Sequence, residues 1–408
     1  MPGFTTQIIH SDRQQPIEHG SLHKPIHANV AFGFDDVQGL VDVFQGKQKG
    51  FAYSRQVNPT VTALESKITK MENGVDTVCF ATGMAAIGST LFALLRKDDH
   101  VVSSSFLFGN TNSLFNTFAS IGVDMSFVDA TAVSNVENAL RDTTRLVFVE
   151  TIANPRTQVS DLERIGKLCA DRSLIYVVDN TMTSPFLFQP IDSSASLVVN
   201  SLTKYISGHG NALGGAVTET GNFDWSQFPN IHDDYKKDSS EKWGLTQIRK
   251  KGLRDFGATL SPEAAFHIAL GAETLALRME RQCATAQSLA NFLHQHSCVE
   301  RVYYPGLENH PEHERADKLF QRPGALLSFE LVDGIDPFQF LNRLKLVINS
   351  TNLGDNRTLA IPVAHTIYYE MGPEMRATMG IADSLIRVSV GIEDCEDLIE
   401  DFDVALQS

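Results

Sequence analysis

Short apolar, β-prone runs alternate with helical segments between about residue 75 and residue 204, and this alternation limits the possible folds more than any other feature. The runs occupy residues 75–81, 100–103, 125–128, 145–150, 174–178 and 197–199. Helical patterns separate them at 85–95, around 135–141 and near 162–169. Strands that alternate with helices form a mostly parallel sheet with helices packed on its faces. The sequence therefore predicts an α/β domain built on a mostly parallel central sheet.

Chemically useful groups recur where these predicted strands end. They are a glycine turn that opens a helix, two acids, two hydroxyls and an amine: Gly83 with Met84, Glu150 and Asp179, Ser201 and Thr203, and Lys204. A glycine at a strand-to-helix turn lets backbone amides face an anion. Ligands bind at the carboxyl ends of the strands in open α/β sheets, so these groups are expected to surround one site.

Lys204 lies in the stretch NSLTKYISGHGNALGG, residues 200–215, among hydroxyls and glycines. Desolvation there would lower its pKa and make it an amine nucleophile able to form a Schiff base. Pyridoxal 5′-phosphate requires such a lysine, amides and hydroxyls for its phosphate, and a carboxylate such as Asp179 for its ring nitrogen. Taken singly, Lys204 also fits a surface-loop lysine, and Asp179 a helix cap or turn residue.

Composition excludes several classes of function. The formal net charge is −15 and no basic run could follow a phosphate backbone, so nucleic-acid and anionic-membrane binding are not expected. The first residues lack a secretion signal and no apolar run reaches membrane-spanning length, which makes the cytoplasm the expected location.

Five scattered cysteines indicate buried free thiols rather than disulfides. The histidine pairs 294/296 and 310/313 lack accompanying ligands, so no metal site is predicted.

The chain is expected to divide into an N-terminal arm (1–60), an α/β domain (61–260) and a smaller α+β domain (261–408). An arm this irregular usually lies on another subunit. A helix is predicted from Thr60 to Met71, and the polar segment 221–256 resembles a linker with a possible helix at 246–253. The last domain is predicted to hold a long helix, two strands and two more helices, at 263–296, 325–331, 385–390, 336–344 and 394–406.

Ordered motifs along nearly the whole chain resemble the Cys/Met-metabolism family of pyridoxal-phosphate enzymes. They include YSRQVNPTVTALE, ATGMAAI, FGNT, ETIANP, VVDNT, NSLTKYISGHGNALGG, ETLALRMERQ, YPGLENHPEHE, LGDNRTL and IRVSVGIED. That family contains cystathionine γ-synthase, cystathionine γ-lyase, methionine γ-lyase and O-acetylhomoserine sulfhydrylase. The resemblance implies a fold-type I enzyme, similar to aspartate aminotransferase, that assembles as a dimer of dimers and acts on an amino acid.

The resemblance also assigns roles to individual residues. Lys204 would hold the cofactor's aldehyde and move protons between the substrate's Cα and Cβ, and Asp179 would pair with the pyridine nitrogen. Gly83, Met84, Ser201 and Thr203 would hold the phosphate. Tyr53, counted with Lys204 as catalytic, and Arg55 would reach the phosphate of a neighbouring subunit. Asn154 would lie near the ring hydroxyl, and Arg387 would bind the substrate carboxylate bidentately.

Departures from the family pattern concentrate in the substrate pocket. Phe108 stands where most relatives have tyrosine, which keeps ring stacking and loses a proton donor for the leaving group. Asn110 replaces glycine or cysteine, and Asn352 replaces the serine common in lyases but resembles O-acetylhomoserine sulfhydrylases. His365, in the segment 362–366, does not occupy the position at which the family pattern has histidine.

These departures favour a γ-replacement reaction on an O-acylhomoserine, because its γ-group departs readily as an anion. The alternative is a γ-lyase acting on methionine, cystathionine or another γ-heteroatom homoserine derivative such as canavanine. A third possibility, a non-catalytic binding protein with the same fold, is disfavoured because Lys204 and Asp179 are both present.

Overall fold

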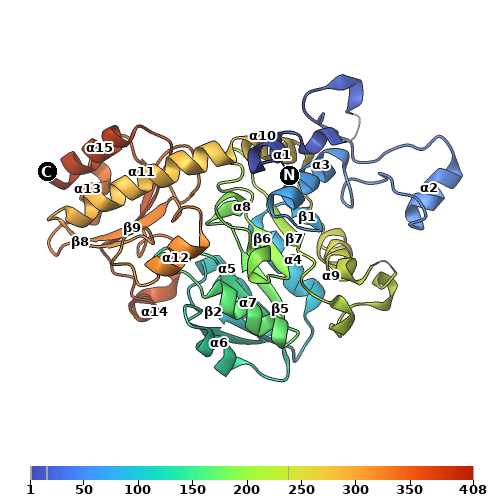
Figure 1. Cartoon of the computed structure of the whole chain (residues 1–408), viewed down its shortest axis with the longest axis horizontal. Helices are drawn as coiled ribbons and strands as arrows, with labels where there is room; N and C mark the ends of the chain where they lie inside the picture. The colour runs from blue at the N-terminus through green and yellow to red at the C-terminus, as the bar shows by residue number, and fades with distance from the viewer. Residues whose placement is uncertain (1, 15–16, 238, 408) are drawn as a thin grey trace.

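The computed structural model describes residues 2–14, 17–237 and 239–407, and its centre is a seven-stranded sheet (Figure 1). The strand order is β1-β7-β6-β5-β4-β2-β3, and β7 runs antiparallel to both of its neighbours while the other pairs are parallel. The strands are β1(Asp76–Phe80), β2(His100–Ser104), β3(Asp124–Val128), β4(Thr144–Glu150), β5(Ile175–Asp179), β6(Leu197–Asn200) and β7(Gly215–Glu219). The predicted mostly parallel sheet is confirmed.

Both faces of this sheet are covered, which explains why its central strands are continuously apolar. Successive side chains of β5 alternate between the two cores: Ile175 and Val177 pack on one face, and Tyr176 and Val178 on the other. The helices of this part of the chain are α3(Pro59–Met71), α4(Gly83–Leu94), α5(Gly109–Ser120), α6(Val133–Ala139), α7(Leu162–Asp171), α8(Ser184–Leu187) and α9(Trp243–Gln247). Local signals set their starts, since the side chain of Asn58 caps α3 ahead of Pro59 and the hydroxyl of Thr82 caps α4.

A second, five-stranded sheet lies towards the C-terminus, in the order β10-β11-β12-β9-β8. Its strands are β8(Val299–Tyr303), β9(Leu326–Leu331), β10(Ile348–Asn349), β11(Leu359–Pro362) and β12(Leu385–Ser389). The helices of this region are α10(Pro262–Glu273), α11(Leu275–Gln295), α12(His313–Leu319), α13(Pro337–Arg343), α14(Gly372–Thr378) and α15(Cys395–Gln407). The predicted C-terminal α+β architecture is confirmed, whereas the domain boundaries at 60 and 260 stay a proposal.

The prediction of a linker at 221–256 is wrong. Trp225 is 0% exposed and joins the core on one face of the main sheet with Ile248 and Leu253. The segment 248–255 is a π-helix that packs on α4. Because its apolar residues follow neither a 3.6-residue nor a 2-residue period, the pattern resembled a polar connection. The predicted helix at 263–296 is likewise two helices, which meet at Thr274.

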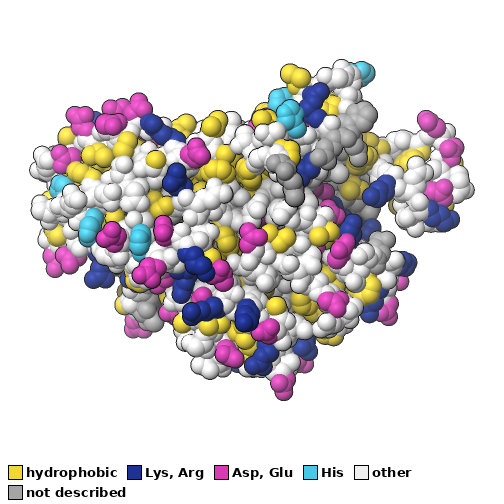
Figure 2. Space-filling view, in the orientation of Figure 1, with side chains coloured by type: hydrophobic (Ala, Val, Ile, Leu, Met, Phe, Trp, Pro, Cys, Tyr) yellow, Lys and Arg dark blue, Asp and Glu magenta, His cyan; other side chains and the backbone are white. Residues whose placement is uncertain are grey.

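The N-terminal region is anchored at α1(Phe4–Ile9) by the buried Ile8, and then extends away from the body of the molecule (Figure 1). The helix α2(Val37–Phe44) has no buried residue. The extension exposes large apolar side chains, and Figure 2 shows hydrophobic groups on its surface: Leu22, Ile26, Val30, Val37, Leu40, Phe44 and Tyr53. None of the helices in the described part of the chain is long and apolar enough to cross a membrane.

Candidate active site

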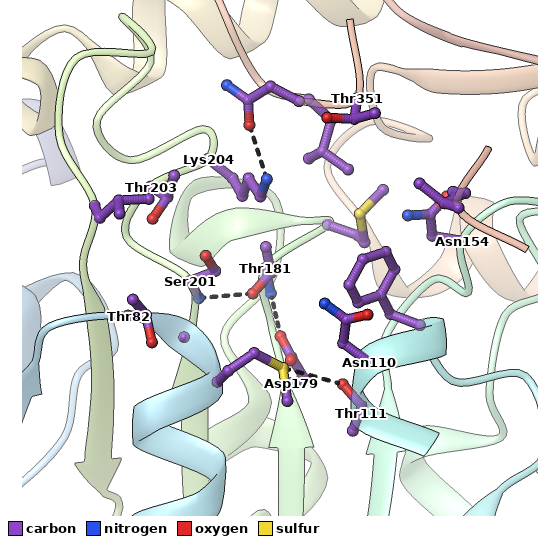
Figure 3. Close-up of a pocket in the computed structure, with 18 of the residues that line it drawn as sticks. Thr82, Asn110, Thr111, Asn154, Asp179, Thr181, Ser201, Thr203, Lys204 and Thr351 are labelled. Atoms are coloured by element: carbon purple, nitrogen blue, oxygen red, sulfur yellow. Dashed lines mark hydrogen bonds between the residues drawn. The ribbon is translucent and has the colours of Figure 1, made fainter. Parts of the chain in front are cut away.

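A cavity of about 860 Å³ opens at the carboxyl ends of β5 and β6, beside the N-termini of α4 and α5 (Figure 3). Loops and strand ends from both sheets line it, so residues far apart in the sequence meet there. The residues of the cavity that the sequence predicted are Gly83, Met84, Phe108, Asn110, Asn154, Asp179, Ser201, Thr203, Lys204, Asn352 and Arg387. These residues therefore line one cavity, and their individual roles stay a prediction.

Lys204 follows β6 and points into the cavity, where its Nζ donates to Oδ1 of Asn352 at 2.7 Å (Figure 3). Burial, together with a smaller effect of the charge of Arg387, lowers the pKa of Lys204 to about 8. A lysine with this pKa is partly neutral at physiological pH, and a neutral amine is the form that attacks a carbonyl or accepts a proton. The alternative of a solvated surface lysine is excluded.

The turn after Lys204 is held by Arg278, a buried arginine on α11. Its guanidinium donates to the carbonyl oxygens of Tyr205 at 2.7 Å and Ile206 at 3.1 Å. Gly208 lies against this guanidinium with φ +72°, and a Cβ there would approach Nη1 of Arg278 to 2.1 Å. The turn therefore needs glycine both for its conformation and for the space that Arg278 occupies.

The N-terminus of α4 forms an anion-binding corner. A Cβ added at Gly83 would lie 2.8 Å from Cβ of Ser201, so glycine is required for the helix to approach that side chain. The first backbone N–H groups of a helix have no intrahelical acceptor and attract negative charge. Thr203 also lines the cavity, where its hydroxyl donates to the carbonyl of Gly214 at 3.2 Å and accepts from its N–H.

Asp179 ends β5, and its Oδ1 accepts from the backbone N–H of Thr181 at 3.0 Å. The hydroxyl of Thr181 in turn accepts from the N–H of Ser201 at 2.8 Å, which joins the ends of β5 and β6 (Figure 3). Burial raises the pKa of the Asp179 carboxyl. Sequence reasoning gave Thr181 no role, although its place two residues after the acid was a usable signal.

Phe108 precedes α5, and Asn110 lies in its first turn. Both line the cavity, and Asn110 and Asn154 lie across it from Lys204 (Figure 3). Oδ1 of Asn154 is buried and has no hydrogen-bond partner among the described residues. Buried polar atoms are rarely left unpaired, so this oxygen marks a place where a bound molecule supplies a polar group.

Arg387, on β12, is 1% exposed. Its Nη2 donates to the carbonyl oxygens of Thr351 and Asn352 at 3.0 and 2.9 Å, while its buried Nε has no partner among the described residues. Burial lowers the pKa of Arg387 to about 10, which leaves it charged at neutral pH. A buried guanidinium with unused donors is suited to a carboxylate.

Tyr53 and Arg55 do not line this cavity. They lie at the base of the N-terminal extension, where Nη1 of Arg55 donates to the carbonyl of Arg254 at 2.6 Å. The Arg55 guanidinium lies 5.4 Å from the centre of the Tyr53 ring, and Tyr53 is 40% exposed. Within one chain, Tyr53 and Arg55 therefore contribute no side chain to the lining of the cavity.

The residues present fit pyridoxal 5′-phosphate. The cavity combines a partly neutral lysine, a strand-terminal carboxyl, a helix N-terminus with an adjacent serine, and an unpaired buried acceptor. The phosphate, aldehyde, ring nitrogen and ring hydroxyl of this cofactor require those four features.

Known proteins resemble the chain over its whole length. A family model described as Cys/Met metabolism PLP-dependent enzyme matches residues 5–407. An L-methionine gamma-lyase of Fusobacterium nucleatum subsp. polymorphum is 38% identical over 99% of this chain and 98% of its own, and a homocysteine synthase of Schizosaccharomyces pombe is 34% identical over 99% and 98%. A structure of cystathionine gamma synthase from Xanthomonas oryzae pv. oryzae superimposes with a TM-score of 0.89 at 31% identity, covering 100% and 98% of the two chains.

Proposed function

The chain belongs to the Cys/Met-metabolism family of PLP-dependent enzymes, and from that premise we propose that it replaces the γ-substituent of an O-acylhomoserine with a thiol. Its relatives are lyases and synthases of sulfur amino acid metabolism. When bound, pyridoxal phosphate supplies an electron sink that stabilises negative charge on the substrate. The residues of the cavity then decide which protons move and which group leaves.

Lys204 is the base of the proposed reaction. Its amine, partly neutral because of burial, takes a proton from Cα of the substrate and transfers protons at Cβ. Oδ1 of Asn352 accepts from this amine at 2.7 Å and holds it at one end of the cavity. A flexible lysine side chain is thereby kept in one position.

Arg387 fixes the orientation of the substrate. Its guanidinium is anchored by the carbonyl oxygens of Thr351 and Asn352, so its remaining donors are held in place for the α-carboxylate. The loop that anchors Arg387 also carries the amide that holds Lys204. The groups that hold Arg387 and Lys204 therefore belong to the same short segment, residues 351–352.

Phe108 is the observation that carries the choice of leaving group. The residues that line the cavity include no tyrosine, histidine or cysteine within the described part of the chain. Without a phenolic acid beside the γ-position, a group that departs as a stable anion is favoured over one that must be protonated as it leaves. The carboxylate released from an O-acylhomoserine is such an anion, whereas a thiolate is more basic.

The test is a product assay with purified holoenzyme. O-acetylhomoserine and O-succinylhomoserine are each supplied with cysteine, sulfide or methanethiol, and products are identified by mass. We expect a thioether or homocysteine to form with at least one pair. If no pair yields a γ-replacement product while a 2-keto acid accumulates without a thiol, the proposal is wrong.

A γ-lyase is the second candidate, because relatives that cover nearly the whole chain include methionine gamma-lyases from Fusobacterium nucleatum and Pseudomonas putida. The same base and carboxylate site would serve elimination. Methionine, cystathionine and canavanine are the substrates to compare, with release of ammonia and a 2-keto acid as the distinguishing product.

Replacing Phe108 with tyrosine tests the leaving-group argument. The added hydroxyl supplies an acid at the γ-position, so kcat/KM for methionine is expected to rise by about 10²-fold relative to that for an O-acylhomoserine, at the lower end of what general acid catalysis contributes. Phe115→Tyr, at a buried position on α5 that does not line the cavity, is the matched control. If the ratio of kcat/KM for methionine to kcat/KM for an O-acylhomoserine is the same in the Phe108→Tyr variant and the wild type, the missing hydroxyl does not select the leaving group.

We also propose that the N-terminal extension binds a second copy of the chain. Its apolar side chains are exposed, and Tyr53 and Arg55 lie outside their own cavity. In an oligomer they would contact the phosphate site of the neighbouring subunit, as the family resemblance implies. A dimer or larger assembly in solution is the expected result of light scattering.

A further inference from the structure

Glu150 is a buried acid in the cavity wall to which the proposed reaction gives no task. It is the last residue of β4, and the strand register places it directly beside Asp179 at the end of β5. Its side chain lines the cavity, and the residue is 7% exposed. Two carboxyl groups thus stand next to each other at the sheet edge where the cofactor ring is expected.

The carboxyl group of Glu150 holds two other residues of the site. Its Oε1 accepts from the backbone N–H of Phe108 at 2.8 Å, and the carboxyl group also accepts from the backbone N–H of Asn154. On its other side Asn154 is held by the hydroxyl of Tyr368, which donates to its carbonyl at 2.7 Å. Phe108 and Asn154 come from different loops, and Glu150 joins their backbone N–H groups at the sheet edge.

The charges around Glu150 decide which acid of the pair is ionised. The neighbouring groups that act on it are Asp179 from β5 and the N–H groups of Phe108 and Asn154, with Tyr368 nearby; no cation acts directly on it among the described residues. Burial and the adjacent Asp179 raise the pKa of Glu150. Two buried carboxylates side by side cannot both ionise readily.

We propose that Glu150 is a positioning residue for the cofactor ring: its carboxyl group stays protonated beside Asp179 and ties Phe108 and Asn154 to the sheet edge. The negative charge of the pair is then left on Asp179, which faces the ring nitrogen. This role does not depend on which γ-group leaves, so it stands or falls separately from the proposed substrate.

The experiment measures the affinity of the apoenzyme for pyridoxal phosphate, with Glu150→Gln and Glu150→Ala variants. Glutamine is neutral and keeps an acceptor oxygen, so E150Q is expected to bind the cofactor within about threefold of the wild type. Alanine leaves two N–H groups without an acceptor, and E150A is expected to bind about 10- to 100-fold more weakly. Glu163→Gln, at an exposed position on α7, is the control and should bind like the wild type.

A second measurement is the thermal stability of the apoenzymes between pH 5 and pH 8. A carboxyl whose pKa is raised in the folded state binds more protons folded than unfolded, so it destabilises the fold increasingly as pH rises through this window. E150Q lacks this group, and its melting temperature is expected to rise relative to the wild type as pH increases. If Glu150 acted only by packing, the difference in melting temperature between E150Q and the wild type would be the same at every pH.

Three results would overturn the proposal. The first is wild-type cofactor affinity in E150A. The second is E150Q that binds the cofactor at least about 10-fold more weakly than the wild type while its apoenzyme melts at the wild-type temperature, which would mean that the ionised carboxylate is needed. The third is a melting difference between E150Q and the wild type that does not change with pH. If E150A does not fold, the second and third results still test the proposal, because they compare E150Q with the wild type.

Discussion

Replacing Lys204 with alanine is expected to abolish the visible absorbance of the lysine-bound cofactor and to lower turnover by about 10²–10⁴-fold. The amine is the only lysine nitrogen that lines the cavity in the described part of the chain, and Asn352 holds it there. Without it, the substrate's Cα proton has no positioned base. Absorbance spectra and initial rates of the purified variant measure the two effects.

The anion-binding corner at Gly83 and Ser201 is unchanged by this substitution, so the variant should still retain pyridoxal phosphate without a covalent bond. The amount of pyridoxal phosphate released on denaturation therefore distinguishes loss of the covalent bond to Lys204 from loss of the cofactor-binding site. Lys318→Ala, which removes a surface lysine paired with Glu163, is the control and should keep both the spectrum and the rate. A K204A enzyme with the wild-type spectrum would contradict the assignment of the lysine.

Replacing Arg387 with alanine is expected to lower kcat/KM by about 10²–10³-fold, mainly through KM. Removing one partner of a buried, hydrogen-bonded charge pair costs about 3–4 kcal/mol, within the range measured for such pairs, and 1.4 kcal/mol is a factor of ten. The substrate carboxylate would lose its guanidinium partner, and the carbonyl oxygens of Thr351 and Asn352 would lose their donor. Steady-state kinetics over a range of substrate concentrations measures the effect.

Arg387→Lys should not restore activity, because an ammonium group cannot contact both carbonyl oxygens and also present a planar pair of donors. Arg281→Ala removes an exposed arginine that pairs with Asp394 and is the control. Cofactor absorbance should persist in all three variants, which shows that the site has folded. If R387A retained the wild-type KM, the substrate carboxylate would have to bind elsewhere.

The family fold could be predicted because its signals are local. Six strands of the main sheet fall on predicted apolar runs, whereas β7, with the sequence GAVTE, was missed. The caps Asn58 and Thr82 stand directly before their helices. Within the segment 221–256 the helix predicted at 246–253 is present, as the end of α9 and a π-helix. The burial of the segment against α4 could not be predicted. The periodicity of apolar residues identifies only regular elements such as α-helices and β-strands.

The cofactor groups at the strand ends were also readable, since parallel strands bring their carboxyl ends to one edge. The hydrogen bonds between them were not. Nothing in the spacing of residues 150 and 179 shows that these two acids are neighbours in register, or that Glu150 accepts from Phe108. Those contacts depend on strand order and on loop conformation.

By itself, the sequence determined the α/β sheet, the family and the lysine at the centre of the site, because each depends on the order and type of residues along the chain. Only the tertiary structure decided the physical state of that site. It placed Asn352 against Lys204, anchored Arg387 on a neighbouring loop, and set Glu150 beside Asp179, with no cation acting directly on Glu150 among the described residues. Burial and charge proximity are properties of space rather than of sequence order, and they determine which of these groups carries a proton.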